Sequence, residues 1–216
     1  MEQSGRFRVY RGVESVPHIN VQAVDEPTLY SVYRSGYTDN QSTVDALETG
    51  DLIEATLAGD PADDAEPWRL TAVKRVGRVR TAFAVDIDPP EVARNCWTPG
   101  AGAPSYTVLT ENGDPIGVCG VQPRAPLPND GAFVPSVLTG LLPLEAEFES
   151  VPEIGDPAIE ALFLDPDPPD ASSHAWPYGV VFLFTRPSTT VAEGIRDAYD
   201  CPLTGDTRPS FDPYGL

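Results

Sequence analysis

The chain has 216 residues, with 33 acidic side chains against 14 lysines and arginines, so its formal net charge is −19. This length can bury the core of one large domain or two small ones, and a hydrophobic fraction of 41% excludes a disordered chain. The 24 prolines favour short elements over long helices, and we predict an α+β fold that is mostly β.

The first part of the chain is predicted to form short strands. Alternating apolar residues bounded by turn residues mark them, as in the strand that Gly50 and Asp51 introduce. The predicted strands cover 6–13, 28–37, 50–57 and 68–87, with one or two helical turns at 43–50 and an acidic loop at 59–67.

The last of these strands contains a change of pattern at Gly77. The apolar residues Leu70 and Ala72 before it have one parity, whereas Val79 and Phe83 after it have the other. A β-bulge at Gly77 would insert one residue, bend the strand and restore a single apolar face. The bulge would also place four arginines on one outward face: Arg69, Arg75, Arg78 and Arg80.

The stretch LETGDLIEATL at 47–57, followed by a loop and a long bent strand, resembles part of an OB-type or similar small barrel. A long strand that bends at a bulge is what a small closed barrel requires. The resemblance implies an N-terminal small β-barrel domain over residues 1–88.

Residues 68–80 hold five of the 14 cationic side chains in a chain that is otherwise strongly acidic. On a barrel face these cations would contact the phosphates of RNA or single-stranded DNA, with aromatic rings available for base stacking. Alternatively, the charges keep an exposed strand edge soluble and protect it from pairing. The candidate nucleic-acid-binding residues are Trp68, Arg69, Lys74, Arg75, Arg78 and Arg80.

Prolines and glycines at 89–104 mark a linker, and the charge distribution supports a boundary there. Residues 1–86 have nine cations and 14 acids, a net charge of −5, whereas residues 87–216 have five cations and 19 acids, a net charge of −14. We therefore predict a β-rich α+β domain at 105–205 and an extended tail at 206–216.

The second domain carries clear local signals. A hairpin is predicted at 105–121 around the turn ENGD, and a helix at 187–202 with Ser188 or Thr189 as its N-cap. The other predicted strands are 144–149, 159–164 and 178–184.

The cysteines and histidines form no recognisable catalytic or metal-binding pattern. With His174, the three cysteines would make a Cys3His zinc set, but no CxxC pair is present, and cysteine is often a small buried apolar residue. Ser172 and Ser173 adjoin His174, but adjacent side chains rarely point at one another, and no G-x-S-x-G elbow exists. We predict no metal, no cofactor and no catalytic residue; the cysteines are Cys96, Cys119 and Cys201.

The composition as a whole resembles that of proteins from salt-in halophiles, above all the haloarchaea. Lys74 is the single lysine beside 13 arginines. Dense carboxylates hold water at molar salt, where charge repulsion is screened within about 3 Å. The resemblance implies an uncharacterised haloarchaeal protein family and a cytoplasmic location, where acidity does not exclude a nucleic-acid partner. No N-terminal signal is visible, and the apolar run at 179–184 is too short to span a bilayer, so no membrane partner is predicted.

These features favour a non-catalytic binding protein, with RNA or single-stranded nucleic acid as the predicted partner. Two alternatives remain open. In one, the apolar strands 159–164 and 178–184 pair with another protein chain. In the other, a small-ligand-binding enzyme has its site between the two halves, although the scarcity of histidine, lysine and cysteine counts against it.

Overall fold

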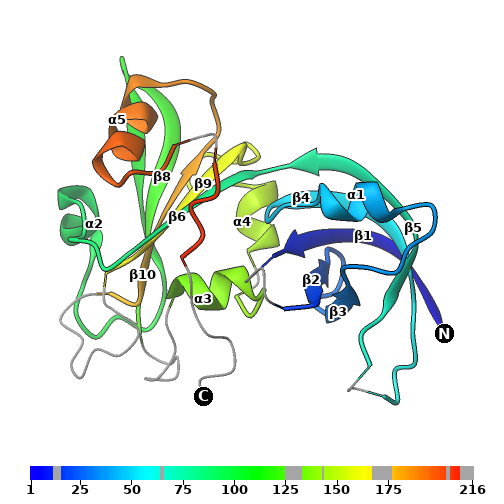
Figure 1. The fold of residues 1–216 in the computed structure, drawn as a ribbon. Helices are drawn as coiled ribbons and strands as arrows, with labels where there is room; N and C mark the ends of the chain where they lie inside the picture. Colours follow the sequence, from blue (N-terminus) through cyan, green and yellow to red (C-terminus); the bar gives the residue numbers. More distant parts are fainter. Residues whose placement is uncertain are drawn as a thin grey trace. The chain divides into compact units, whose positions relative to one another are not determined.

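The structure is a computed structural model, and it describes residues 1–11, 16–63, 66–124, 133–142, 144–166, 177–202 and 205–209. Within these ranges the chain forms ten strands and five short helices, so the predicted mostly β, α+β class is confirmed. None of these helices is long and apolar enough to cross a membrane. Two compact units each contain one five-stranded sheet (Figure 1): Met1–Val79 with Val137–Glu145, and Arg80–Ser136 with Ala146–Ser210.

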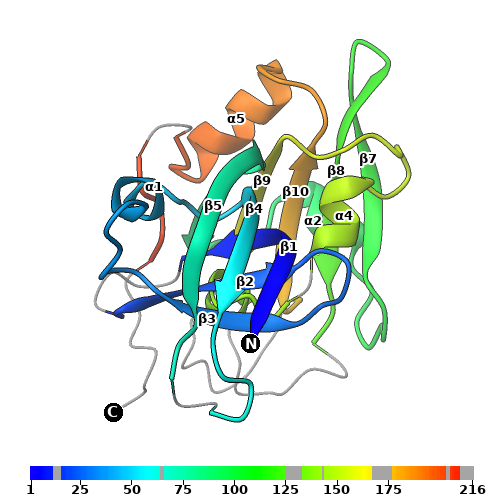
Figure 2. The same cartoon turned by 90° about the vertical axis from the view of Figure 1, so that its right-hand side faces the viewer.

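The first sheet is antiparallel and open. Figure 2 shows β4 between β5 and β1. Helix α1 (Gln41–Asp45) connects β3 to β4, and an isolated parallel bridge between Val32 and Trp68 links the two edge strands. A closed barrel, as predicted for this part of the chain, is not observed. The strands are β1 (Glu2–Tyr10), β2 (His18–Ala23), β3 (Leu29–Tyr33), β4 (Asp51–Ala58) and β5 (Arg69–Arg78), in the order β3-β2-β1-β4-β5.

Alternation along β4 explains the core of the first unit. Successive side chains of a strand point to opposite faces, and every second residue from Asp51 to Leu57 is buried. The apolar members of this set pack with the inward residues of the other strands. The buried members of this core include Phe7, Val9, Val21, Val32, Ile53, Leu57 and Trp68.

The second sheet is mixed, with β6 parallel to β9 and the other pairs antiparallel. Its strands are β6 (Arg80–Val85), β7 (Ser105–Glu111), β8 (Asp114–Gln122), β9 (Glu160–Asp165) and β10 (Gly179–Phe184), in the order β6-β9-β10-β8-β7. The long strand predicted at 68–87 is therefore divided, since it ends at Arg78 in one sheet and resumes at Arg80 in the other.

Helices cover both faces of the second sheet. On one face, α2 (Glu91–Cys96) and α5 (Thr190–Ala198) pack on a cluster that includes Leu162 and Leu164. On the other face, Phe163 contacts Phe133 of α3 (Phe133–Leu138) and Phe148 of α4 (Glu145–Glu149). A strand covered on both sides is apolar at nearly every position, and this is why 159–164 and 178–184 do not alternate between apolar and polar residues.

The structure corrects the hypothesis that these two apolar strands pair with another chain. All six residues of β9 and all six of β10 are buried. The two strands pair with each other, and β6 and β8 occupy their outer sides. No edge of either strand is open in the described part of the chain.

Two local predictions in the second unit are confirmed. The β7–β8 hairpin turns at Asn112 and Gly113, whose φ angles of 54° and 90° are those of a type I′ turn. Helix α5 begins after Thr189, whose side-chain oxygen accepts a hydrogen bond from the backbone N–H of Ala192 at 3.1 Å.

One local prediction is wrong, and two elements were not predicted. The strand expected at 144–149 is helix α4, because its alanine and glutamates favour helix and Phe148 is its one side chain recorded as buried. The predicted linker at 89–104 contains α2, and strand β2 was not predicted at all.

The segment 137–145 belongs to the first unit although it is remote from it in sequence. Arg8 of β1 is only 4% exposed, and its Nε and Nη2 donate to the Glu145 carboxylate at 2.7 and 2.6 Å. The Asn20 side chain donates to the carbonyl of Thr139 at 2.8 Å. These bonds fix the returning segment on the first sheet.

Replacing Arg8 with Gln should lower the free energy of unfolding by roughly 3 kcal/mol, because a nearly buried carboxylate would lose both charged donors. The measurement is the urea midpoint at constant salt. Lys74→Gln is the matched control, since Lys74 is exposed, and its effect should stay within about 0.5 kcal/mol. Equal midpoints for the two variants would contradict the assignment.

Candidate functional site

The basic segment 68–80 is shaped by two irregularities in the ladder between β4 and β5. The pairing steps from Gly77 to Arg75 and leaves Val76 as an extra residue, which confirms the bulge predicted at Gly77. A second shift in register, which the sequence pattern did not predict, leaves Thr71 as another extra residue.

The second shift divides the cationic side chains between the two faces of β5. Residues that pair across an antiparallel ladder share a face. Arg69 pairs with Ala58 on the outer face. Arg75 and Arg78 lie on the inner face, because their partners in β4 are the buried Ile53 and Asp51. The prediction of one common outward face for these arginines is therefore wrong.

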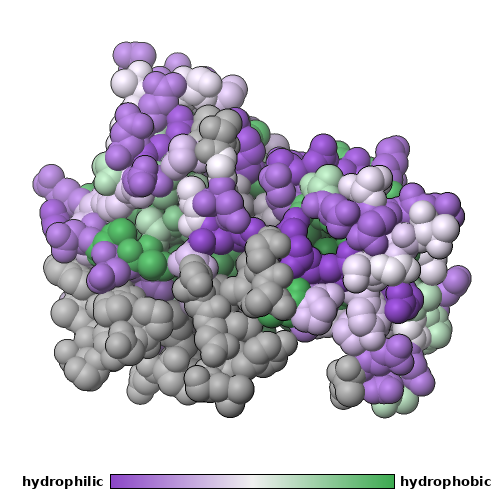
Figure 3. All heavy atoms as spheres, in the orientation of Figure 1, coloured by the Kyte–Doolittle hydropathy of each residue, from purple (hydrophilic) through white to green (hydrophobic). Residues whose placement is uncertain are grey.

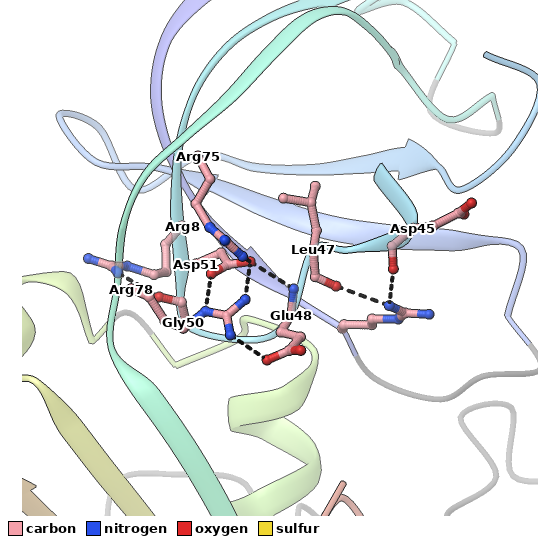
Figure 4. A network of polar contacts seen from close by, with 9 residues as sticks. Arg8, Asp45, Leu47, Glu48, Gly50, Asp51, Arg75 and Arg78 are labelled. Atoms are coloured by element: carbon pink, nitrogen blue, oxygen red, sulfur yellow. Dashed lines mark hydrogen bonds and ion pairs between the residues drawn. The ribbon is translucent and has the colours of Figure 1, made fainter. Parts of the chain in front are cut away.

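Asp51 explains why arginines lie on the inner face (Figure 4). Its side chain is 0% exposed, and its carboxylate accepts from Arg78 Nε at 2.5 Å and from Arg78 Nη2 at 3.1 Å. The backbone N–H of Glu48 donates to the same carboxylate at 2.9 Å, and Arg75 Nη1 lies 3.8 Å away. The hydrogen bond to Asp51 raises the pKa of Arg78. Arg78 and Asp51 thus form a charge pair with a buried carboxylate.

Two further arginines hold the turn that precedes Asp51, and Figure 4 labels one of them, Arg8. Arg8 Nη1 donates to the carbonyl of Gly50 at 2.8 Å. Arg11 Nη1 donates to the carbonyls of Leu47 at 3.0 Å and Asp45 at 3.1 Å. Residues 45–51 therefore accept hydrogen bonds from Arg8 of β1, from Arg11 immediately after it, and from Arg78 of β5.

A buried carboxylate in the second unit has partners of the same kind. Glu160 of β9 is 2% exposed, and its carboxylate lies 2.5 Å from Arg196 Nη1 and 3.5 Å from Arg80 Nη2. Arg80, the last of the candidate nucleic-acid-binding arginines, therefore also serves a buried acid.

The remaining candidates differ in their surroundings. Trp68 is 9% exposed, packs edge-on against Tyr30, and has Gly59 against its ring, so little of it is open for base stacking. The guanidinium of Arg69 lies over the ring of Tyr33, 4.5 Å from its centroid. Lys74 is exposed and pairs with Glu54 across the ladder. Of the six candidates, Arg69 and Lys74 are the two that face outward without a buried carboxylate as partner.

The cysteines are packed in the second unit. Cys119 and Cys201 belong to its core, and Cys96 packs against that core. Burial raises the pKa of Cys119 to about 12 and that of Cys201 to about 11, so both thiols are protonated and unreactive near neutral pH. His174, the fourth member of the zinc set considered above, and the neighbouring serines lie outside the described residues.

A hollow of about 280 Å³ lies in the first unit, at the edge of β3. Its lining includes Trp68, which bridges to β3, and carboxylates from the β4–β5 connection. We call it the β3 hollow. Its lining residues are His18, Leu29, Tyr30, Ser31, Asp60, Pro61, Asp63, Glu66, Pro67 and Trp68.

The lining gives the β3 hollow an acidic and partly aromatic character. Burial lowers the pKa of His18, so its imidazole is neutral near pH 7 and does not offset the three carboxylates. Among the described residues, no group of three or more His, Cys, Asp or Glu is arranged to hold a metal ion. The hollow is therefore suited to a cationic organic group, which carboxylates pair with and aromatic rings attract.

Sequence reasoning did not identify the β3 hollow. Its residues come from 18–31 and 60–68, and no motif connects these two stretches. The acidic composition of 59–67 predicts a loop and nothing more, and the one available signal is the aromatic richness of 28–37.

Replacing Arg78 with Gln should lower the free energy of unfolding by roughly 3 kcal/mol, because the fully buried carboxylate of Asp51 would lose the charged group that donates two hydrogen bonds to it. Arg75→Gln is the matched control. It should cost less than about 1 kcal/mol, since Arg75 is half exposed and 3.8 Å from the carboxylate. Urea unfolding of both variants measures this, and a larger loss for Arg75→Gln would reverse the assignment.

Comparison with known proteins places the chain in a family. A model described as "Family of unknown function (DUF6663)" matches residues 1–204, which include both sheets. No curated protein and no solved structure matches the chain. Because the match covers nearly the whole length, the chain belongs to the DUF6663 family of unknown function.

Proposed function

We propose that this protein is a non-catalytic binding protein whose first unit is an OB-type module. The support is topological. Five strands in the order β3-β2-β1-β4-β5, with a parallel bridge from β3 to the residue before β5, give the neighbour relations of a partly open five-stranded Greek-key barrel. The short helix α1 lies between β3 and β4.

The observation that carries the proposal is the position of the β3 hollow. OB-type modules bind ligands on the face of their second and third strands and with the loops that follow strands 1 and 4. The hollow is lined from β2, from β3 and from the β4–β5 connection. We therefore propose that a ligand binds at His18, Tyr30 and the carboxylates of that connection.

The chemistry of the hollow favours a cationic ligand over a nucleic acid. Asp60, Asp63 and Glu66 would repel phosphates, and Arg75, Arg78 and Arg80 are engaged by carboxylates. Of the six candidate residues, Arg69 and Lys74, the cations on the outer face of β5, would be left to contact a nucleic acid.

We also propose that the protein operates in high salt. Hydrophilic side chains cover most of the described surface in the view of Figure 3, and the chain carries a net charge of −19. Salt screens repulsion between exposed carboxylates beyond a few ångströms, so the folded state gains stability as ionic strength rises.

A capture experiment at about 2 M KCl, well inside the screened range, tests the binding proposal. Wild-type protein should retain a ligand from lysate. The charge-reversed variant D60K/E66K should retain at least tenfold less of the same ligand. The variant R69Q/K74Q is the matched control and should retain it. If D60K/E66K retains RNA and R69Q/K74Q does not, the ligand binds at the outer face of β5, and the proposed site in the β3 hollow is wrong.

Thermal unfolding at about 0.1 M and about 2 M KCl tests the salt proposal. The melting temperature should be higher at 2 M by at least about 4 °C, which corresponds to roughly 1–2 kcal/mol for a chain of this size. Equal or higher stability at 0.1 M would remove the proposal, because unscreened repulsion predicts the opposite order.

A further inference from the structure

The edge of β3 presents backbone groups that can pair with another strand. The N–H of Ala23 donates to the carbonyl of Thr28, so the alternation of an antiparallel ladder directs the backbone groups of Tyr30 and Val32 toward β2. The intervening residues, Leu29 and Ser31, therefore direct theirs away from β2, toward the β3 hollow.

The chain itself uses only part of this edge. Trp68 donates its N–H to the carbonyl of Ser31 at 2.7 Å and accepts from the N–H of Tyr33 at 3.0 Å. The pairing stops there, because the N–H of Glu66 turns back to the carbonyl of Asp63. In the described part of the chain, no partner is recorded for the N–H of Ser31 or the carbonyl of Leu29.

The side chains around this free edge determine what can occupy it. Among the lining residues, Asp60 and Glu66 are exposed carboxylates, and Tyr30 is a half-buried ring. The volume of about 280 Å³ is near the lower end for ligand pockets and suits one long side chain rather than a folded partner. A strand that pairs with the edge would direct alternate side chains into the hollow.

We propose that the β3 hollow takes an extended basic peptide segment, which adds to the edge of β3 at Leu29–Ser31 and inserts a lysine or arginine between Asp60, Glu66 and Tyr30. The inference rests on the proposed binding function and names the class of ligand. Main-chain hydrogen bonds to Ser31 and Leu29 supply the register, and the carboxylates select for positive charge.

Two labelled hexapeptides, alternating Val-Arg and alternating Val-Glu, serve as probes in fluorescence anisotropy at about 1 M KCl, where diffuse attraction is screened to about 3 Å. The basic peptide should bind at least tenfold more tightly than the acidic one. Ser31→Pro should weaken it at least tenfold, since proline removes the free N–H but is tolerated on an edge strand. Ser31→Ala keeps the backbone N–H and removes only the side chain that donates to Asn20, so it should retain at least tenfold more binding than Ser31→Pro does.

A second set of variants changes only charge, so its result does not depend on any effect of proline on folding. D60N/E66Q should weaken binding of the basic peptide at least tenfold, whereas D156N/D197N, the same charge change on exposed residues of the second unit, should not. The inference would be overturned if the two peptides bound equally well or if neither peptide bound. It would also be overturned if Ser31→Pro bound the basic peptide as tightly as the wild type does. If a lysate ligand is still lost with D60K/E66K while neither peptide binds, the proposed function stands and the peptide inference falls. The peptide inference would also be overturned if a 12-nucleotide RNA competed with the basic peptide for the hollow and failed to bind the Ser31→Pro variant.

Discussion

The carboxylate of Asp51 is the group on which the arrangement of the first unit depends. It follows Gly50, whose φ of 92° sets the turn into β4, and it is fully buried. An isolated buried carboxylate is very costly, so charged donors must reach it. Arg78 does so from β5, and the N–H of Val79 then donates to the carbonyl of Gly50 at 3.0 Å. This contact fixes where β5 ends, one residue before the chain enters the second sheet.

Pairing with buried acids also explains the charge distribution of the chain. A protein with 33 acidic residues and 14 cations has few cations to place, and arginine serves a buried carboxylate better than lysine because its guanidinium donates through a planar fork. Arg78 with Asp51 and Arg196 with Glu160 follow this rule, and Arg8 pairs in the same way with Glu145, whose side chain is 12% exposed. The cluster of positive charge at 68–80 is therefore in large part a structural feature, and the binding proposal depends on the β3 hollow instead.

The sequence predicted what local patterns control. The hairpin at Asn112 and Gly113, the cap at Thr189 and the bulge at Gly77 each depend on residues whose backbone or side-chain preferences are strong. The second irregularity, at Thr71, has no such marker, and it moves Arg75 and Arg78 to the inner face.

Contacts between segments that are distant in the sequence could not be predicted from it. Nothing near Arg78 indicates that Asp51, 27 positions away, is its partner, since only the register of two strands brings them together. The β3 hollow has the same origin, because it exists where the bridge from Trp68 to β3 stops. Helix α4 was missed because the alternation of its apolar residues is also typical of a strand.

A double-mutant cycle on Asp51 and Arg78 tests the central claim most directly. Unfolding free energies would be measured in urea for wild type, D51N, R78Q and the double variant, at one salt concentration. If the buried carboxylate requires Arg78, the two substitutions should be strongly non-additive, with a coupling energy of about 2 kcal/mol. Additive effects, within about 0.5 kcal/mol, would contradict the account. The arginines of 68–80 would then again be candidates for binding a polyanion.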